Sequence, residues 1–245
     1  MKYIITDKQY QILKEQTEQV LKLPSVDYFG GWDNLQQYLV RKNNPPYSLD
    51  GELDLADSNV TSLGNLISVK GNLHLNGSKI ESLGNLTDVG GDLVLSWTKL
   101  KSLGNLTHIG GTADLMDSKI ESLGNLTRVD RDLMLNDTRK IKSLGNLTSV
   151  GRDVILTSSK LKSLGNLTEV GGTLELFNSN VKNLGNLTSV GGNLNAYMGD
   201  LESLGNLTSV GGNLDLGGCK ILFNYKTRKR IRNIVDVGEN IKLTV

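Results

Sequence analysis

The four-residue sequence Leu-Gly-Asn-Leu occurs eight times in this chain of 245 residues and constrains its fold more than any other feature. The copies begin at Leu63, Leu83, Leu103, Leu123, Leu144, Leu164, Leu184 and Leu204. Successive copies lie twenty residues apart, except for one interval of twenty-one residues that includes Arg139 and Lys140. A fixed period of this length is typical of a solenoid, in which each repeat buries its apolar side against its neighbours. We therefore expect one elongated repeat domain rather than two compact domains.

Each repeat contains a segment in which apolar residues alternate with other residues, for example Leu-Val-Leu at 93–95. This alternation indicates a short strand with the leucines inward and the residue between them outward. The pattern occurs nine times between Leu53 and Leu216, and a degenerate copy follows at 237–243. The rest of the repeat is too short for a helix, and its glycines indicate turns in which Gly84 and its equivalents take positive φ. The sequence predicts a mainly β fold, a single right-handed parallel β-solenoid.

Small polar residues form a second inward column after each strand. They are Ser58, Ser78, Thr98, Ser118, Thr138, Ser159, Ser179 and Cys219. A buried stack of hydroxyls can satisfy turn amides that water does not reach. On this interpretation Cys219 is a small core substitute rather than a nucleophile, and as the single cysteine it excludes an internal disulfide. We also expect the amide of Asn85 and its equivalents to bond turn backbone in a neighbouring coil.

Residues 1–50 precede the repeats and contain all three prolines and seven of the twelve aromatic residues. Thr6 and Gln9 have the spacing of a capping box, so we expect a first helix that runs up to Leu23. Asp33 is expected to cap a second short helix. Because an open solenoid end exposes apolar groups and unpaired strand edges, we interpret this region as an α-helical N-terminal cap. The alternative is a docking module for another protein.

The repeat breaks after residue 216, and the segment 225–235 places Ile231, Ile234 and Val235 on one helical face. We expect residues 217–245 to form a C-terminal cap with a basic helix and a last strand. The helix would expose a basic patch made of Lys226, Arg228, Lys229, Arg230 and Arg232. Such a patch can contact phosphates, but nucleic acid is not the expected partner because aromatic residues are not interleaved with the charges. An acidic protein, or the acidic flank of another copy, is an equal alternative.

Residues 51–216, a solenoid of about nine coils, resemble leucine-rich repeats in which Ser or Thr replaces the usual Asn. The sequence Gly-Asn-Leu-Thr-Ser-Val-Gly-Gly-Asn-Leu at 205–214 is similar to the repeats of receptor L domains and their bacterial relatives. This resemblance implies a stack of parallel coils. The repeats have three residues between Val89 and Leu93 and no convex helix, which favours a nearly straight stack over a horseshoe. The opening Met-Lys-Tyr-Ile-Ile-Thr resembles the starts of bacteriophage proteins, which implies a viral source.

The repeats differ from one another chiefly at their outward strand positions. Apolar residues there are expected to form one exposed stripe: Val94, Trp97, Met116, Met134, Ile155, Phe177, Tyr197 and Met198. Aromatic and Met residues are enriched at interface centres, and a contiguous exposed apolar strip marks a partner site. The alternatives are a scattered, neutral surface or a stripe that lies beneath the N-terminal helices.

No arrangement of residues in the sequence indicates catalysis, a cofactor or a metal. His74 and His108 lie in different columns and away from the cysteine, so zinc is not expected. Column carboxylates such as Asp114 and Glu175 are two or three coils apart, which is too far for paired acid–base catalysis. No phosphate-binding loop motif occurs. We therefore expect a protein that is not an enzyme.

The sequence predicts a scaffold that binds a protein partner through its outward strand face. A structural or self-assembling component, for example of a phage particle, is the alternative, and sugar binding at the aromatic residues is a third. The net charge is +1, with mildly acidic repeats and a basic C-terminal end, so no global field attracts nucleic acid or a membrane. Because no signal peptide or membrane span is recognisable, we expect a cytoplasmic or virion-associated protein whose Asn-Leu-Thr triplets are not glycosylated.

Overall fold

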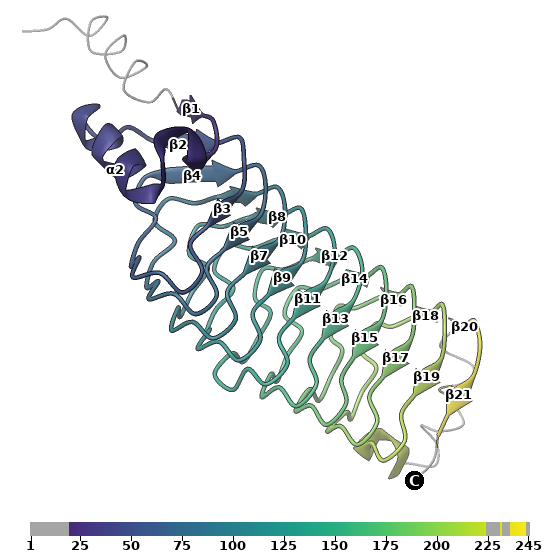
Figure 1. The fold of residues 1–245 in the computed structure, drawn as a ribbon. Coiled ribbons are helices and arrows are strands. Elements are labelled where there is room, and N and C mark those ends of the chain that lie inside the picture. Colours follow the sequence, from purple (N-terminus) through teal and green to yellow (C-terminus); the bar gives the residue numbers. More distant parts are fainter. Residues whose placement is uncertain (1–19, 224–230, 232–235, 244–245) are drawn as a thin grey trace, which may run out of the picture.

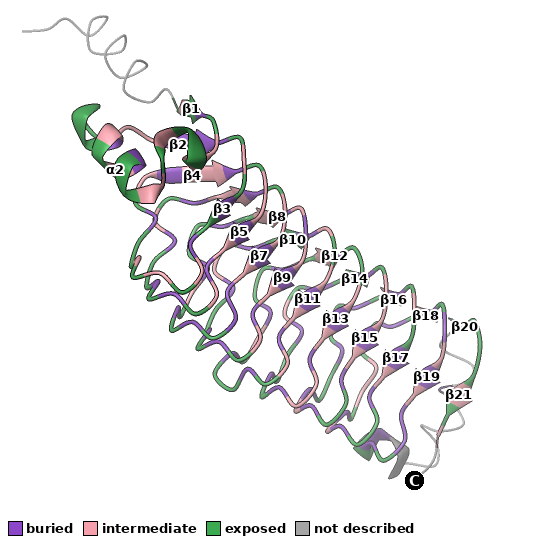
Figure 2. Ribbon diagram, viewed as in Figure 1, coloured by how far each residue is buried: buried purple, intermediate pink, exposed green. Residues whose placement is uncertain are grey.

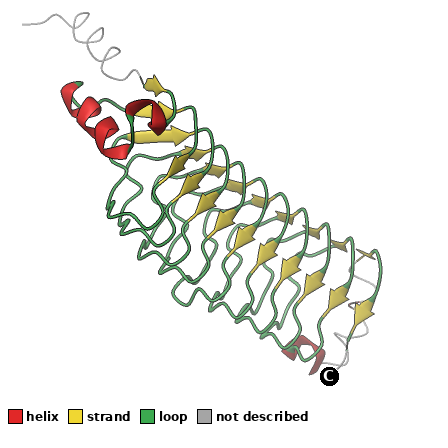
Figure 3. Ribbon diagram, viewed as in Figure 1, coloured by secondary structure: helices red, strands yellow, loops and turns green. Residues whose placement is uncertain are grey.

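The chain winds into a stack of coils in the computed structural model, which describes residues 20–223, 231 and 236–243 (Figure 1). The stack has about eight turns, and each turn takes about twenty residues. In every coil the backbone passes through two short strands, and equivalent strands of successive coils pair in parallel. The two resulting sheets run along the length of the body (Figure 3). The predicted mainly β parallel solenoid is confirmed.

One of the two sheets, named sheet B here, is the sheet that the alternating leucines predict. Its ten strands are β3 (Leu53–Asp54), β5 (Leu73–His74), β7 (Leu93–Val94), β9 (Ala113–Asp114), β11 (Leu133–Met134), β13 (Val154–Ile155), β15 (Leu174–Glu175), β17 (Leu194–Asn195), β19 (Leu214–Asp215) and β21 (Ile241–Lys242). From β3 to β19 the first residue of each strand is buried and the second points outward. The extra residue at 139 or 140 lies between strands, so Leu133 still pairs with Val154.

The other sheet, named sheet A, was not predicted from the sequence. Its eleven strands are β1 (Leu21–Leu23), β2 (Tyr47–Leu49), β4 (Leu66–Val69), β6 (Asp88–Val89), β8 (His108–Ile109), β10 (Arg128–Val129), β12 (Ser149–Val150), β14 (Glu169–Val170), β16 (Ser189–Val190), β18 (Ser209–Val210) and β20 (Asp236–Val237). Most of these strands have two residues and are followed by glycines. A strand this short shows no alternation, so the sequence pattern indicates only a turn.

Six apolar positions of each repeat point into the interior of the coil. In one repeat they are Leu86, Val89, Leu93, Leu95, Leu100 and Leu103, none of them more than 1% exposed. These side chains stack on their equivalents in the neighbouring coils, so the core is a continuous column along the body (Figure 2). Because burying one leucine contributes about 2 kcal/mol, each coil is stabilised chiefly by the coils on either side.

The inward column of small polar residues is buried, but its hydrogen bonds differ from expectation. The hydroxyls of Ser78, Thr98 and Ser118 donate to the carbonyl oxygen three residues earlier, at 2.6, 2.7 and 2.7 Å. These three satisfy carbonyl groups at the strand ends, whereas Ser58 Oγ accepts the N–H of Val60 at 3.4 Å, so the prediction that the column satisfies turn amides holds only there. The thiol of Cys219 is buried and donates to the carbonyl oxygen of Ala196 at 2.8 Å. Burial also raises the pKa of this thiol, which agrees with a core substitute.

The Leu-Gly-Asn-Leu motif forms a tight turn. Its glycine has φ between 57° and 62° in all eight copies, which confirms the prediction of positive φ. The residue two positions earlier fastens the turn, as when Ser82 Oγ accepts the N–H of Gly84 at 3.0 Å. The Asn of the motif is exposed, and Asn85 Nδ2 donates to Asn65 Oδ1 of the preceding coil at 3.1 Å. In this copy the amide bonds a side chain, whereas Asn146 Nδ2 donates to the carbonyl oxygen of Gly124 at 3.5 Å and Asn65 Nδ2 to that of Asn44 at 2.7 Å, as we expected of the motif.

Along the side of these turns the coils approach one another two by two. Isolated parallel bridges join Ser62 to Ser82, Ser102 to Ser122, Ser143 to Ser163 and Asn183 to Ser203. Within the first pair, the N–H of Asn85 donates to the carbonyl oxygen of Gly64 at 3.0 Å. A Cβ added to Gly84 would clash with that oxygen, whereas a Cβ added to Gly104 would meet no atom within 4 Å. A sequence period of one coil thus produces a structural period of two coils on this side.

A short helix, α2 (Trp32–Arg41), lies at the N-terminal end of the stack and follows the 3₁₀ turn η1 (Val26–Phe29) (Figures 1 and 3). It buries Leu35 and Leu39. The expected second helix is present, but Asp33 is not its cap. Gly31 occupies the N-cap position, and Asp33 lies in the first turn, where a carboxylate favours the positive end of the helix dipole.

The N-terminal region also extends sheet A. Strand β1 pairs in parallel with β2, and β2 pairs with β4. We expected Leu21–Leu23 to end a first helix, and this part of the prediction is wrong. Leu23 precedes Pro24, and a residue before proline favours extended backbone, which suits a strand. The remainder of that helix, from Thr6 onward, lies outside the described residues. The region is therefore only partly helical in the described part.

At the other end, η2 (Lys220–Phe223) follows the last repeat, and β20 and β21 pair with β18 and β19. The predicted last strand is present. The basic helix expected at 225–235 lies outside the described residues, apart from Ile231, which is buried. The predicted basic patch lies outside them too: Lys226, Arg228, Lys229, Arg230 and Arg232.

We expect Gly84→Ala to destabilise the protein more than Gly104→Ala. Both glycines have φ of 61°, where an alanine costs about 1–2 kcal/mol. Only Gly84→Ala adds a clash with backbone of the preceding coil, and such overpacking costs about 1–3 kcal/mol more. Urea denaturation followed by circular dichroism measures the two losses. Equal losses would contradict the pairing of coils two by two.

Candidate interaction face

The outer side of sheet B presents the side chains that vary between repeats. In pairing order its outward residues are Asp54, His74, Val94, Asp114, Met134, Ile155, Glu175, Asn195 and Asp215. Because adjacent strands lie about 4.8 Å apart, Met134 and Ile155 are direct neighbours. Asp114 separates Val94 from Met134. Within this column the apolar residues are therefore Val94 and the pair Met134 and Ile155, and the stripe that we expected also runs through the next outward column, which contains Met116.

The predicted binding residues fall into two groups by exposure. Val94, Met116, Met134 and Ile155 are half-buried. Trp97, Phe177, Tyr197 and Met198 are exposed, with 67%, 37%, 37% and 60% of their surface accessible. These four are the exposed large apolar side chains of residues 51–216. Within the described part of the chain, neither α2 nor η1 covers them.

Phe177 and Tyr197 form a stacked pair just beyond the ends of β15 and β17. Their ring centroids lie 6.1 Å apart and their planes are inclined by 11°. The two residues occupy equivalent positions in successive coils, so the strand spacing holds the rings side by side. The pair places two exposed aromatic side chains next to the exposed side chain of Met198, which follows Tyr197 in the chain.

Trp97 and Met198 occupy a turn position whose backbone is left-handed in every repeat. The nine occupants of this position are Asp57, Gly77, Trp97, Asp117, Asp137, Ser158, Asn178, Met198 and Gly218, with φ between 52° and 72°. Gly, Asn and Asp adopt this conformation readily, whereas bulky side chains are strained in it. Trp97 and Met198 thus depart from what the turn favours. Strain of this kind persists where a side chain serves binding or catalysis.

Glu175 is a carboxylate of this face with unused hydrogen-bonding capacity. Its Oε1 atom is buried and has no hydrogen-bond partner among the described residues. Burial raises the pKa of Glu175, the amide of Asn195 and the N–H of Phe177 partly offset this, and Asp215 raises it further. By contrast, Asp114 and Asp215 each accept the backbone N–H two residues further along, at 3.1 and 3.0 Å. Because this oxygen is buried, a donor from outside can reach it only after the Glu175 side chain rotates outward.

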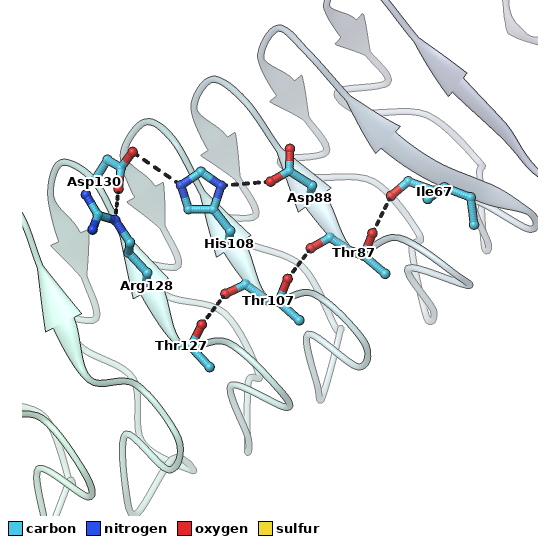
Figure 4. A network of polar contacts seen from close by, with 8 residues as sticks. All are labelled: Ile67, Thr87, Asp88, Thr107, His108, Thr127, Arg128 and Asp130. Carbon is cyan, nitrogen blue, oxygen red and sulfur yellow. Dashed lines mark hydrogen bonds and ion pairs between the residues drawn. The ribbon is translucent and has the colours of Figure 1, made fainter. Parts of the chain in front are cut away.

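A separate polar network lies on the outer side of sheet A (Figure 4). His108 Nδ1 lies 2.7 Å from Asp88 Oδ2, and its Nε2 lies 3.2 Å from Asp130 Oδ2. Arg128 pairs with the other oxygen of Asp130. Burial lowers the pKa of His108, but the hydrogen bonds and charges of the two carboxylates outweigh it and raise the pKa. This network was not expected from the sequence, although residues 88, 108 and 128 occupy equivalent positions in successive repeats.

A ladder of threonines follows the Leu-Gly-Asn-Leu motif along the same sheet (Figure 4). The hydroxyl of Thr107 donates to the carbonyl oxygen of Thr87 at 2.9 Å, and that of Thr127 donates to Thr107 at 3.0 Å. The series continues to Thr208. The polar groups of sheet A therefore fasten one coil to the next.

In the described residues no group of three or more His, Cys, Asp or Glu side chains is arranged to hold a metal ion.

No protein-family model matches this chain, and no curated protein matches it either. None of the helices in the described residues is long and apolar enough to cross a membrane. We therefore identify the candidate interaction face from the geometry of the molecule alone. Two of its features, the free oxygen of Glu175 and the strained backbone of Trp97 and Met198, had no signal in the sequence pattern.

We expect Trp97→Asn to keep or raise the stability of the protein. Asn178 occupies the equivalent turn position, and relief of left-handed strain at Trp97 should contribute up to about 1 kcal/mol. Since Trp97 is 67% exposed, little apolar burial is lost. The free energy of unfolding in urea measures the change. A loss of more than about 2 kcal/mol, typical of core truncation, would show that Trp97 is a packing residue.

We expect His108 to stabilise the protein more at acidic than at alkaline pH. Its folded-state pKa is raised, so its stabilisation is fully present below the unfolded-state pKa of about 6.5 and is lost as the pH rises through the folded-state value. The difference in melting temperature between the wild type and His108→Gln should therefore be larger at about pH 5.5 than at about pH 8. Asp130→Asn should reduce this pH dependence. A difference that is the same at both pH values would contradict the charge-based role.

Proposed function

We propose that this protein is a non-enzymatic repeat scaffold that binds another protein through the outer side of sheet B. One observation carries the proposal. The exposed large apolar residues of the repeats, Trp97, Phe177, Tyr197 and Met198, all lie on or beside that side. Two of them occupy backbone positions that favour small or polar residues. Exposed aromatic and Met side chains are the types that dominate protein interfaces.

Binding fits these residues better than catalysis does. The carboxylates of the outward column lie in separate coils, and Asp114 and Asp215 are engaged with turn backbone. A periodic, open surface without an enclosed cluster of acid, base and nucleophile suits recognition of a large partner. We further propose that the coils are variants of leucine-rich repeats, in keeping with the resemblance of residues 51–216 to receptor L domain repeats.

A structural or self-assembling role, for example in a virus particle, is the second candidate. It is favoured by a basic strip between the left-handed turn and the next Leu-Gly-Asn-Leu motif. The exposed cations there are Lys79, Lys99, Lys101, Lys119, Arg139, Lys140, Lys142, Lys160, Lys162 and Lys182. The outer side of sheet B is acidic, so two copies could associate side by side. Such a heterologous contact can propagate.

The test is capture of partners from an extract of the natural host. We expect the immobilised wild type to retain a protein that the double variant Trp97→Asn/Tyr197→Ser does not retain, because both aromatic anchors are removed. Tyr28→Ser is the matched control, since Tyr28 is an exposed aromatic residue of η1 outside the repeats.

Identical captured proteins for all three baits would contradict the proposed face. Light scattering of the pure protein separates the second candidate. Growth into large species that salt dissolves would favour self-assembly through opposite charges. A monomer whose mass does not change with salt would instead favour binding to a different protein.

A further inference from the structure

The charged residues of the solenoid are segregated by side. Each repeat contributes a six-residue segment to sheet B and the turn beyond it, such as 92–97, in which Leu93 and Leu95 point inward. The nine such segments, named the acidic face here, contain no Lys or Arg. They contain eleven acidic residues: Glu52, Asp54, Asp57, Asp92, Asp114, Asp117, Asp132, Asp137, Asp153, Glu175 and Asp215. All fourteen Lys and Arg residues of 51–216 lie on the other sides of the coils.

The fold itself does not require these negative charges. Asn195 accepts the backbone N–H two residues further along at 3.0 Å, as Asp114 does at 3.1 Å. Asn178 adopts the left-handed turn conformation at φ 52°, as Asp117 does. An uncharged amide therefore serves both turn positions equally well. Eleven negative charges spread over about 40 Å repel one another. A positively charged partner would offset this repulsion, so the charge of the face favours a cationic partner.

Two cations of the chain already pair with the acidic face: Arg152 Nε lies 3.8 Å from Asp132 Oδ1, and Lys242 pairs with Asp215. Lys242, in the terminal strand β21, lies in register with Asp215, and its Nζ is 3.9 Å from Asp215 Oδ2. Beyond β19 the chain thus supplies its own ammonium group to the carboxylate at the end of the column. The other carboxylates of the same outward column are Asp54, Asp114 and Glu175, and these are open to a cation from outside.

The residues around the aromatic pair suit a guanidinium group. Glu175 and Phe177 lie two residues apart on the same side of the sheet, so their outward side chains start about 7 Å apart. Phe177 and Tyr197 present parallel rings on which a planar cation can stack. Once its side chain rotates outward, the Glu175 carboxylate, whose buried Oε1 has no partner among the described residues, can accept the N–H groups of that cation. An arginine side chain meets both requirements at once, whereas an ammonium group cannot stack in this way.

A second aromatic group with a neighbouring carboxylate lies further along the face. Trp97 and Asp117 occupy the left-handed position in successive coils, about 4.8 Å apart along the body. Four coils separate Trp97 from the level of Phe177, a distance of about 19 Å, which about six residues of extended chain can span. The two clusters can therefore take two arginines of a single segment.

We propose that the acidic face binds an extended, arginine-bearing basic segment of another protein, with one arginine between Glu175 and the Phe177–Tyr197 pair and another at Trp97. This inference rests on the proposed function, because it names the chemistry of the partner that the outer side of sheet B recognises.

The test measures binding of a fluorescein-labelled arginine–serine repeat peptide of about ten residues, long enough to span both clusters. Fluorescence anisotropy is recorded with the full chain at low and physiological ionic strength. We expect Glu175→Gln/Asp117→Asn to weaken binding by roughly tenfold, because one carboxylate of each proposed arginine site is lost. Glu81→Gln/Glu169→Gln is the matched control. It removes the same charge from exposed positions outside the acidic face and should change the affinity by less than about twofold.

Two further peptides test the arginine requirement. Lysine in place of arginine should weaken binding several-fold, and citrulline should abolish it. Equal weakening by both double variants, or equal affinity for the lysine peptide, would overturn the proposal in favour of non-specific charge attraction. A captured host protein that depends on Trp97 and Tyr197 but not on Glu175 or Asp117 would overturn this inference and leave the proposed function intact. Salt-sensitive self-association lost only in Glu175→Gln/Asp117→Asn would overturn it too, because the face would then bind a second copy.

Discussion

Every coil of this protein is held to the next by parallel backbone hydrogen bonds between residues that are one repeat apart in the sequence. Leu93 pairs with Leu73 on one side and with Ala113 on the other, and the same register holds along sheet B. Because each position stacks on its own equivalent, an inward leucine in one coil requires an apolar residue in the next. The continuous buried column, the threonine ladder and the left-handed turns all follow from this register.

The two sheets use their outer surfaces differently. On sheet A, side chains bond across coils, as the threonine ladder and the bridge from His108 to Asp88 and Asp130 show. On sheet B, Asp92 and Asp153 also accept N–H groups of the next coil, from Thr112 and Thr173, and Asp114 and Asp215 fasten turns within their own coils. The Trp97, Phe177 and Tyr197 side chains remain exposed on this sheet. We propose that these exposed side chains contact another molecule.

Two kinds of residue on sheet B go beyond the needs of the scaffold. Trp97 and Met198 occupy turn positions for which Gly, Asn or Asp is better suited. The acidic residues repel one another at positions where Asn serves equally well, as Asn178 and Asn195 do. Neither the strain nor the repulsion stabilises the stack. Both are accounted for if the surface has been shaped to hold a cationic and partly apolar segment.

The sequence alone determined the solenoid, the inward leucines and the positive φ of glycines such as Gly84, because each recurs at a fixed period and has a local physical cause. It did not reveal sheet A, since a two-residue strand such as Asp88–Val89 has no alternation, nor the strand at Leu21–Leu23, whose pairing partner lies beyond a helix. Only the tertiary structure decided which side chains share a surface. The free oxygen of Glu175, the strain at Trp97 and the pairing of coils two by two depend on distances between coils. A one-dimensional pattern of identical repeats does not contain those distances.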